Sequence, residues 1–234
     1  MVVEGAEFKK AFGEFMGRFY ASLRGTTPAL REYASRGLIR SIAFAKDRTI
    51  DDVESMIATW RENRNLAGST PTTSFIPMIL VTVERGFMVT GSDFASPITD
   101  TMTVALNAEK PHELVGVQTI IYDQKAQIVI IAADHPTARG IAAQFTLFLA
   151  NVDNRRFYAS YADPYGNEIK MPCVLESPEV FPMIGNPDQK NMTVIIFDTT
   201  WKESVPYFSL PDSLVYEAEV SGSVRDYDVN ANPV

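Results

Sequence analysis

Few residues in this 234-residue chain are suited to metal or nucleophilic chemistry. It has two histidines, His112 and His135, and one cysteine, Cys173. The histidines are too far apart in sequence to form a local ligand pair, so we expect no transition-metal site. Cys173 has no partner for an internal disulfide, and we interpret it as a small buried apolar residue. His112 falls in an expected loop and His135 at an expected helix start, so we assign neither a catalytic role.

Two pairs of carboxylates are close enough in sequence to suggest general acid–base chemistry. Asp51 and Asp52 suit the positive N-terminal end of a helix, whereas Asp163 and Glu168 suit a turn rich in Pro and Gly. The alternative is an enzyme that gathers Asp93, Asp163 and Glu168 around a pocket from distant loops. The chain has no phosphate-binding glycine loop and no G-x-S-x-G motif. We therefore expect no catalytic, cofactor-binding or metal-binding residues.

One short segment, Asn154-Arg155-Arg156-Phe157-Tyr158, combines basic and aromatic residues. Such a combination can stack a nucleic-acid base or anchor a protein partner. Because the formal net charge of the chain is −8, a surface that grips phosphates is disfavoured. We therefore take Arg155, Arg156, Phe157 and Tyr158 as a candidate subunit interface. An acidic wall could still surround DNA and let it slide without specific binding.

The overall composition is that of a folded protein. Apolar residues make up 46% of the chain, which is enough for a real core and argues against wholesale disorder. No apolar run approaches the roughly 20 residues that span a bilayer, and the first residues lack the pattern of a signal peptide. We expect a protein without a membrane partner that is made, and kept or assembled, in the cytoplasm.

The clearest pattern in the sequence is a pair of apolar, β-rich runs, Leu114–Tyr122 and Lys125–Ala132. Two polar residues, Asp123 and Gln124, separate the runs. A two-residue break of this kind predicts a β-hairpin, although Asp-Gln is not a favoured turn pair.

A helix is predicted directly after this hairpin, over Thr137–Ala150. Asp134 or His135 can cap it, and Pro136 is tolerated in its first turn because no intrahelical hydrogen bond is lost there. Its apolar residues recur at steps of three and four, which places them on one face toward the sheet: Ala138, Ile141, Ala142, Phe145, Phe148 and Leu149.

Three further helices are predicted in the first part of the chain. Glu4–Leu23 carries one apolar stripe, which packs either on its own core, the interpretation we favour, or on a neighbouring subunit. Thr27 can cap a second helix, Pro28–Arg36, that Gly37 would end. The third helix is expected over Ile50–Asn63. The stripe of the first helix consists of Phe8, Phe12, Phe15, Phe19 and Leu23.

The remaining patterns predict short strands separated by turns. Pro77 indicates that the first part of its strand lies at an edge or a bulge, and Pro172 is expected to interrupt another strand. The turn Glu84-Arg85-Gly86 should bring Phe87–Thr90 back as the partner of the strand before it, and Ser177–Lys190 is expected to be an irregular loop. The strands are Phe75–Val83, Phe87–Thr90, Thr101–Leu106, Arg155–Tyr161, Ile169–Leu175, Met192–Phe197 and Leu214–Val220, with a weaker indication at Leu38–Ala45.

These elements predict an α+β fold with a mixed, mostly antiparallel sheet. A hairpin–helix–strand core is flanked by N-terminal helices and carries long loop insertions. We expect a single domain over residues 1–220, with its helical segment at residues 1–66. Residues 221–234 are expected to form a flexible tail, or an arm that becomes ordered on a partner.

The segment Gln127–Ala142 resembles part of the tail-terminator and neck (tail-completion) proteins of tailed bacteriophages. In that family an apolar strand ends in a polar turn, a helix of the form x-x-Ala-Arg-x-Ile-Ala follows, and then a long strand. The resemblance covers about forty residues of the chain. Phe87–Glu113 and Ser177–Leu210 would be insertions relative to a minimal terminator.

The resemblance implies a structural virion protein and not an enzyme. Copies would form a ring, with a hexamer favoured, at the end of the tail tube or at the head–tail junction. DNA would pass through the channel without specific binding, and other neck and tail proteins would be the partners. The alternative is a tail-tube or baseplate subunit of the virion.

Overall fold

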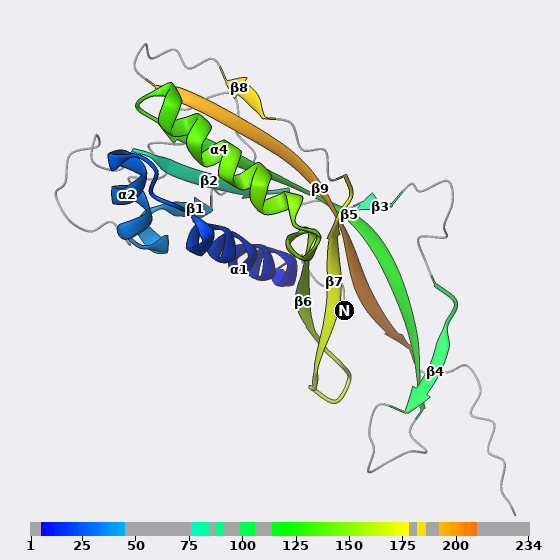
Figure 1. The fold of residues 1–234 in the computed structure, drawn as a ribbon. Helices are drawn as coiled ribbons and strands as arrows, with labels where there is room; N and C mark the ends of the chain where they lie inside the picture. Colours follow the sequence, from blue (N-terminus) through cyan, green and yellow to red (C-terminus); the bar gives the residue numbers. More distant parts are fainter. Residues whose placement is uncertain are drawn as a thin grey trace, which may run out of the picture.

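The computed structural model describes residues 6–44, 76–84, 88–90, 99–105, 114–177, 182–185 and 192–209. It confirms the α+β class, because three α-helices cover a mixed, mostly antiparallel sheet (Figure 1). The helices are α1 (Ala6–Ser22), α2 (Pro28–Ser35) and α4 (His135–Ala150). The strands are β1 (Ile42–Phe44), β2 (Met78–Val83), β3 (Met88–Val89), β4 (Met102–Ala105), β5 (Leu114–Ala132), β6 (Arg156–Ala162), β7 (Glu168–Leu175), β8 (Met183–Gly185) and β9 (Thr193–Ser209).

The nine strands form one sheet around β5 and β9. The main order is β1-β2-β5-β9-β7-β6, while β3 and β4 also pair with β5 and β8 pairs with β9. Among the described strands, β1 and β2 pair in parallel, and the other pairings are antiparallel. The two longest strands are therefore neighbours at the centre, and the shorter strands attach along their lengths.

The predicted hairpin within residues 114–132 is wrong, because this segment is one continuous strand. All 17 residues of β9 have a partner on β5, from the Gly116–Ser209 pair to the Ala132–Thr193 pair. Asp123 and Gln124 lie inside this ladder, opposite Lys202 and Trp201. Both polar side chains find partners there, so neither has to form a turn.

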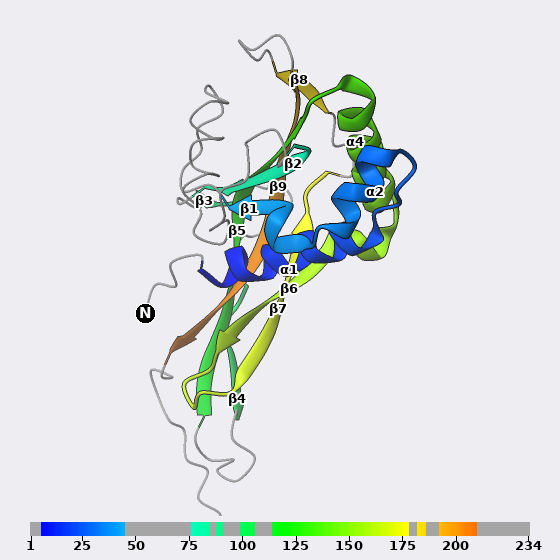
Figure 2. The same ribbon diagram turned by 90° about the vertical axis from the view of Figure 1, so that its left-hand side faces the viewer.

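The helices lie together on one face of the sheet (Figure 2). The apolar stripe of α1 packs on its own subunit, because Phe8, Phe12, Phe15 and Phe19 are fully buried in the main core. Burying an aromatic side chain of this size contributes about 2 kcal/mol. Phe12 and Phe15 also contact Trp201 of β9, with ring centroids 5.6 and 5.1 Å away. These contacts attach α1 to the centre of the sheet.

The ends of two helices follow the predicted capping chemistry. Asp134 is the N-cap of α4, and its Oδ1 accepts a hydrogen bond of 2.8 Å from the Thr137 backbone N–H. Thr27 caps α2 in the same way through the Leu30 N–H, at 3.2 Å. Gly37 follows α2 with a φ of +91°, a backbone conformation that glycine adopts without strain. Local sequence therefore determines where these helices begin and end.

Several predicted strands occur in places or with partners that differ from the expectation. β3 pairs with β5 and not with β2. Pro172 does not interrupt β7, because it lies opposite Tyr158 of β6 at a point where β7 has not yet begun to pair with β9. A short strand, β8, lies within the segment predicted to be an irregular loop. Pro77 immediately precedes β2.

Strand β9 is much longer than the predicted strand Met192–Phe197. Because it is a central strand, Ser177–Leu210 is not a simple insertion into the fold. The predicted helix Ile50–Asn63, the strand Leu214–Val220 and the tail at residues 221–234 lie outside the described residues.

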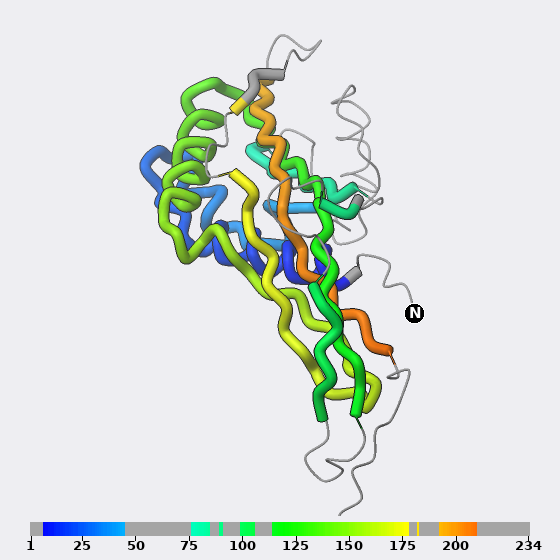
Figure 3. Tube along the Cα trace, turned by 90° about the vertical axis from the view of Figure 1, so that its right-hand side faces the viewer, coloured from blue at the N-terminus to red at the C-terminus, as the bar shows by residue number. Residues whose placement is uncertain are grey.

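The β5–β9 pair extends well beyond the helix layer (Figure 3). At its far end β4 pairs with β5 between Met102–Val117 and Ala105–Leu114. Two large apolar side chains are exposed in this region: Met102 of β4 is 67% exposed and Tyr207 of β9 is 52% exposed. We refer to β4 with residues 114–121 and 204–209 as the distal ribbon.

Candidate functional site

The four residues predicted to form a subunit interface have different surroundings. Arg155 donates from Nε to the Leu149 carbonyl oxygen at 2.8 Å and from Nη2 to the Ala150 carbonyl oxygen at 3.2 Å, so it caps the C-terminal end of α4. Phe157 is a core residue, only 5% exposed, and it contacts the α1 phenylalanines and Trp201. Phe157 is therefore unsuited to contact another subunit. Arg156 and Tyr158 remain exposed.

Strand β6 is the edge of the main strand order among the described residues. Side chains alternate along it, so Phe157, Ala159 and Tyr161 face the core while Arg156 and Tyr158 point away. The Arg156 carbonyl oxygen accepts a hydrogen bond of 3.2 Å from Arg18 Nη2 of α1. An edge strand offers backbone groups that can pair with another chain.

Of the carboxylates considered for an enzyme, the structure describes Asp163 and Glu168, and each has hydrogen-bond partners of its own. Asp163 is bound within its own turn, where Oδ1 accepts from the backbone N–H groups of Tyr165 at 2.9 Å and Asn167 at 2.7 Å. Desolvation raises the pKa of Asp163, but these hydrogen bonds outweigh it and the net pKa is lowered. A hydrogen bond with Ser160 lowers the pKa of Glu168. Asp93 lies outside the described residues.

A buried polar cluster under α1 was not predicted from the sequence. Tyr161 of β6 donates to Glu203 Oε1 of β9, and Gln124 of β5 also hydrogen-bonds Glu203. Burial raises the pKa of Glu203, and the negative charge of Glu7 raises it further. Cys173 of β7 lies beside this cluster with no exposed surface. Its pKa is also raised by burial, so the structure agrees with the interpretation of Cys173 as an unreactive thiol.

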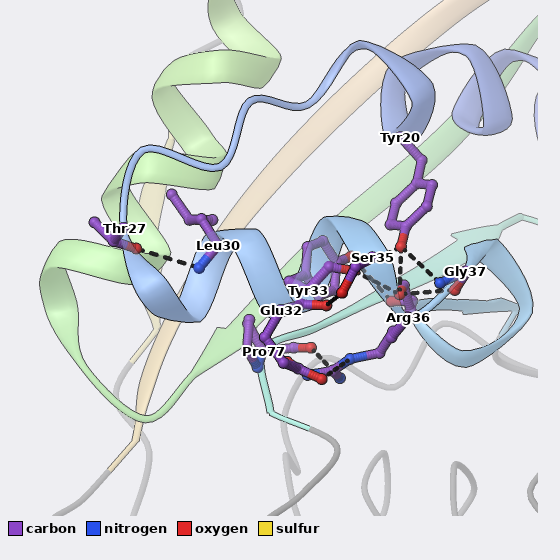
Figure 4. A network of polar contacts seen from close by, with 10 residues as sticks. Tyr20, Thr27, Leu30, Glu32, Tyr33, Ser35, Arg36, Gly37 and Pro77 are labelled. Carbon is purple, nitrogen blue, oxygen red and sulfur yellow. Dashed lines mark hydrogen bonds and ion pairs between the residues drawn. The ribbon is translucent and has the colours of Figure 1, made fainter.

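A second hydrogen-bond network joins α1, α2 and β2 (Figure 4). Tyr20 Oη donates to the Tyr33 carbonyl oxygen at 2.6 Å and accepts from the Gly37 N–H at 3.1 Å. Arg36 forms an ion pair with Glu32 one turn earlier and donates to the Pro77 carbonyl oxygen at 3.0 Å. Burial raises the pKa of Tyr33.

The face of the sheet opposite the helices carries regular cross-strand rows. Each row takes one residue from β2, one from β5 and one from β9. Two rows are apolar and buried, and the next two are polar. In the order β2, β5, β9, the apolar rows are Met78–Ile131–Val194 and Leu80–Val129–Ile196, and the polar rows are Thr82–Gln127–Asp198 and Glu84–Lys125–Thr200.

A pocket of about 200 Å³ lies over the two polar rows and is lined by all six of their residues. Gln127 is only 2% exposed, and its Nε2 donates to Asp198 Oδ1 at 2.6 Å. Its Oε1 is buried without a hydrogen-bond partner. Burying an amide oxygen in this state costs about 1–3 kcal/mol, so a ligand donor at this pocket would be stabilising. Glu7 Oε2, on α1, is the other buried side-chain oxygen without a partner among the described residues.

The next row along the same face carries the side-chain ammonium group of Lys202. Lys202 Nζ lies 2.6 Å from Asp123 Oδ1, 2.9 Å from Glu176 Oε1 and 2.6 Å from Thr90 Oγ1. Partial burial lowers the pKa of Lys202, but the bonds and charges of Asp123 and Glu176 outweigh it and the net pKa is raised. This face therefore accommodates a positive charge among carboxylate and hydroxyl oxygens.

Neither a metal cluster nor a membrane-spanning helix is found in the described part of the chain. No three His, Cys, Asp or Glu side chains gather there in a way that could hold a metal ion. None of its helices combines the length and the apolar character needed to cross a bilayer. His135 is exposed at the start of α4, and His112 lies outside the described residues.

Comparisons with known proteins add no assignment to this geometry. The chain matches no protein-family profile, and a search of curated proteins gives no match. The functional argument therefore uses the fold, the exposed surfaces and the polar pocket.

Proposed function

We propose that this chain is a structural subunit of a tailed-bacteriophage virion that assembles into a ring, as a tail terminator or a neck protein. The observation that carries the proposal is the distal ribbon, which projects beyond the helix-covered core. Met102 and Tyr207 are exposed on opposite faces of it, because Met102 shares a cross-strand row with Val117 whereas Tyr207 lies opposite Gln118. We take each of these large side chains as a separate point of contact with another polypeptide. A second copy or a neighbouring virion protein would cover them.

The edge of β6 supports the same role. Tyr158 is 49% exposed there, next to the exposed Arg156. Tyrosine and arginine are the residue types most enriched at the centres of protein interfaces. Of the predicted interface residues, we keep Arg156 and Tyr158 as contacts, and we assign Arg155 to the cap of α4 and Phe157 to the core.

The resemblance at Gln127–Ala142 agrees with the local structure. This segment contains the end of β5, the turn capped by Asp134 and the first half of α4. The net charge of −8 suits a ring that surrounds DNA without gripping it, because like charges keep the phosphates away from the wall. A hexameric ring is the assembly that we propose.

The test mixes the purified full-length chain with tails assembled without it and measures tail completion by electron microscopy. We expect the protein at one end of each tail. A double variant, Met102→Ser with Tyr207→Ser, should lose this activity while keeping the unfolding temperature of the wild type. The matched control is Val152→Ser, since Val152 is 69% exposed but lies next to α4, away from the distal ribbon.

The position of the bound protein decides between the alternatives. Labelling along the whole tail would favour a tail-tube subunit. Failure of the wild-type chain to join tails would contradict the proposal, and so would full activity of the double variant. The mass of the isolated chain does not decide the question, because ring subunits can be monomers before assembly.

A further inference from the structure

The polar pocket on the face opposite the described helices has the properties of a binding site for one positively charged group. Eight residues line it, and six of them belong to the two polar rows, whose positions follow from the pairing of three adjacent strands. Because the strands are paired on both sides of β5, the rows are held by the centre of the sheet and not by a loop. Such a site is preorganised before any ligand arrives.

Gln127 determines which kind of group the pocket accepts. Its Nε2 must face Asp198, because the opposite orientation would place two acceptor oxygens together. This fixes Oε1 in the position where it has no partner. The unsatisfied group is therefore an acceptor, and its missing partner is a hydrogen-bond donor.

The other lining groups favour a donor that carries a positive charge. Glu84 and Asp198 place two carboxylates at the pocket, while Lys125 contributes one positive charge. Thr82 and Thr200 add hydroxyl groups that can accept hydrogen bonds. Lys202, on the same face, shows that an ammonium group is stable among oxygens of the same types.

The size and shape of the site select among cationic donors. A water molecule takes up about 30 Å³, so a pocket of about 200 Å³ has room for the head of one side chain and little more. A guanidinium group presents several N–H donors in one plane, and it can satisfy an amide oxygen and a carboxylate together. An ammonium group offers three donors but lacks this planar arrangement.

We propose that this pocket binds the guanidinium group of an arginine side chain presented by a binding partner, with Gln127 Oε1 as its buried acceptor. The proposal goes beyond the assembly role and does not depend on it, because a small ligand can test it on an isolated subunit. If the arginine site fails, the distal ribbon still carries the proposed function, and the converse also holds.

The experiment titrates the ¹⁵N-labelled full-length chain with N-acetyl-arginine amide and follows its NMR spectrum. We expect saturable shifts in the side-chain amide of Gln127 and in the backbone amides of Thr82 and Thr200. For a single small group, a dissociation constant on the order of 1 mM is expected. The citrulline analogue has the same shape but no charge and should bind at least tenfold more weakly.

Two substitutions in the pocket should change the affinity in opposite directions. Gln127→Met removes the acceptor at nearly constant volume and should weaken binding about tenfold or more, because a hydrogen bond to a charged group is lost. Lys125→Met removes a competing positive charge and should strengthen binding by about twofold to fivefold. The matched control is Gln118→Met, since Gln118 lies on β5 outside the pocket.

Several results would overturn the proposal. These are equal binding of the citrulline analogue, unchanged affinity in Gln127→Met, or the absence of saturable shifts at the pocket. Shifts produced by Mg²⁺ but not by the arginine probe would assign the pocket to a metal ion instead. The unfolding temperature of Gln127→Met is measured alongside, and the wild-type titration with both analogues gives an answer even if this variant does not fold.

Discussion

Asp123 and Lys202 face each other across the β5–β9 ladder, and their side chains form an ion pair of 2.6 Å. The pair occupies the position where the local sequence predicts a turn. Lys202 also contacts Glu176 and Thr90, so its charge joins β9 to two other segments. A polar residue within a long strand is stable when a partner of the opposite charge lies directly across from it.

Lys202→Met should lower the free energy of unfolding by about 0.5–1 kcal/mol at low ionic strength, because the network is partly exposed. The loss should shrink in about 1 M salt, where the Debye length falls to about 3 Å. Urea unfolding at both salt concentrations measures it. Lys170→Met, at an exposed strand position, is the control. A salt-independent loss would show that packing and not charge is responsible.

Phe157→Ala should destabilise the protein by about 3–5 kcal/mol, because it opens a cavity among buried aromatic rings. Tyr158→Ala, at the next position on β6, should change stability by less than about 0.5 kcal/mol. Chemical denaturation of both variants tests the assignment of Phe157 to the core and Tyr158 to the surface. Similar values for the two variants would contradict it.

Asp134→Ala should cost about 1 kcal/mol, because the N-cap of α4 is lost. Asp134→Asn keeps an acceptor oxygen for the Thr137 N–H and should retain most of the stability. Thermal unfolding followed by circular dichroism compares the two variants. Equal losses would indicate that the charge of Asp134, and not its cap hydrogen bond, is responsible.

Glu203→Gln should make the stability of the protein less sensitive to pH. The pKa of Glu203 is raised by burial and by Glu7, so the folded state binds the proton more tightly than the unfolded state. Its contribution to stability is therefore complete below about pH 4.3, the ordinary value for glutamate, and falls as the pH rises toward the pKa of Glu203 in the folded protein. The variant should gain stability relative to wild type across that interval.

Glu168→Gln should show the opposite dependence of stability on pH. Because the pKa of Glu168 is lowered in the folded state, its contribution is present above the ordinary pKa and is lost as the pH falls. Unfolding free energies measured from about pH 2 to pH 8 for both variants test the two directions, since the Glu168 contribution is lost only below about pH 4.3. A pH-independent difference between Glu203→Gln and wild type would refute the role of burial.

Cys173 should not react with a disulfide exchange reagent in the native protein and should react completely after denaturation. The thiol is buried, so the reagent cannot reach it, and its pKa is raised, so little of the reactive thiolate forms. The absorbance of the released thiolate measures the extent of reaction. Because the chain has only this cysteine, the result is unambiguous. Rapid reaction of the native protein would contradict the burial.

The helices could be predicted from the sequence because their signals are local. The phenylalanine stripe of α1 and the Asp134 cap of α4 involve residues within a few turns of one another. The same is true of Thr27 and Gly37 at the ends of α2. Each of these features depends on chemistry that neighbouring residues supply, and the structure places each as expected.

The continuity of β5 through Asp123 and the polar sites could not be predicted, because the partners of these residues are distant in sequence. Asp123 is 79 residues from Lys202, and Gln127 is 71 residues from Asp198. A short sequence pattern does not predict which distant residue will pair with a given strand residue. The predicted strand at Met192–Phe197 was too short for the same reason, since Asp198 to Ser209 belong to β9 through pairing with β5 and β7, which are distant in sequence.

The unbroken register of β5 and β9 has a mechanical consequence. The backbone hydrogen bonds of an antiparallel pair run perpendicular to the strands. A pull directed along the two strands would load all the bonds of the 17-residue ladder together, in shear, and none could open first like a zipper. The central strand pair should therefore resist extension along its length and transmit force between the two ends of the ladder.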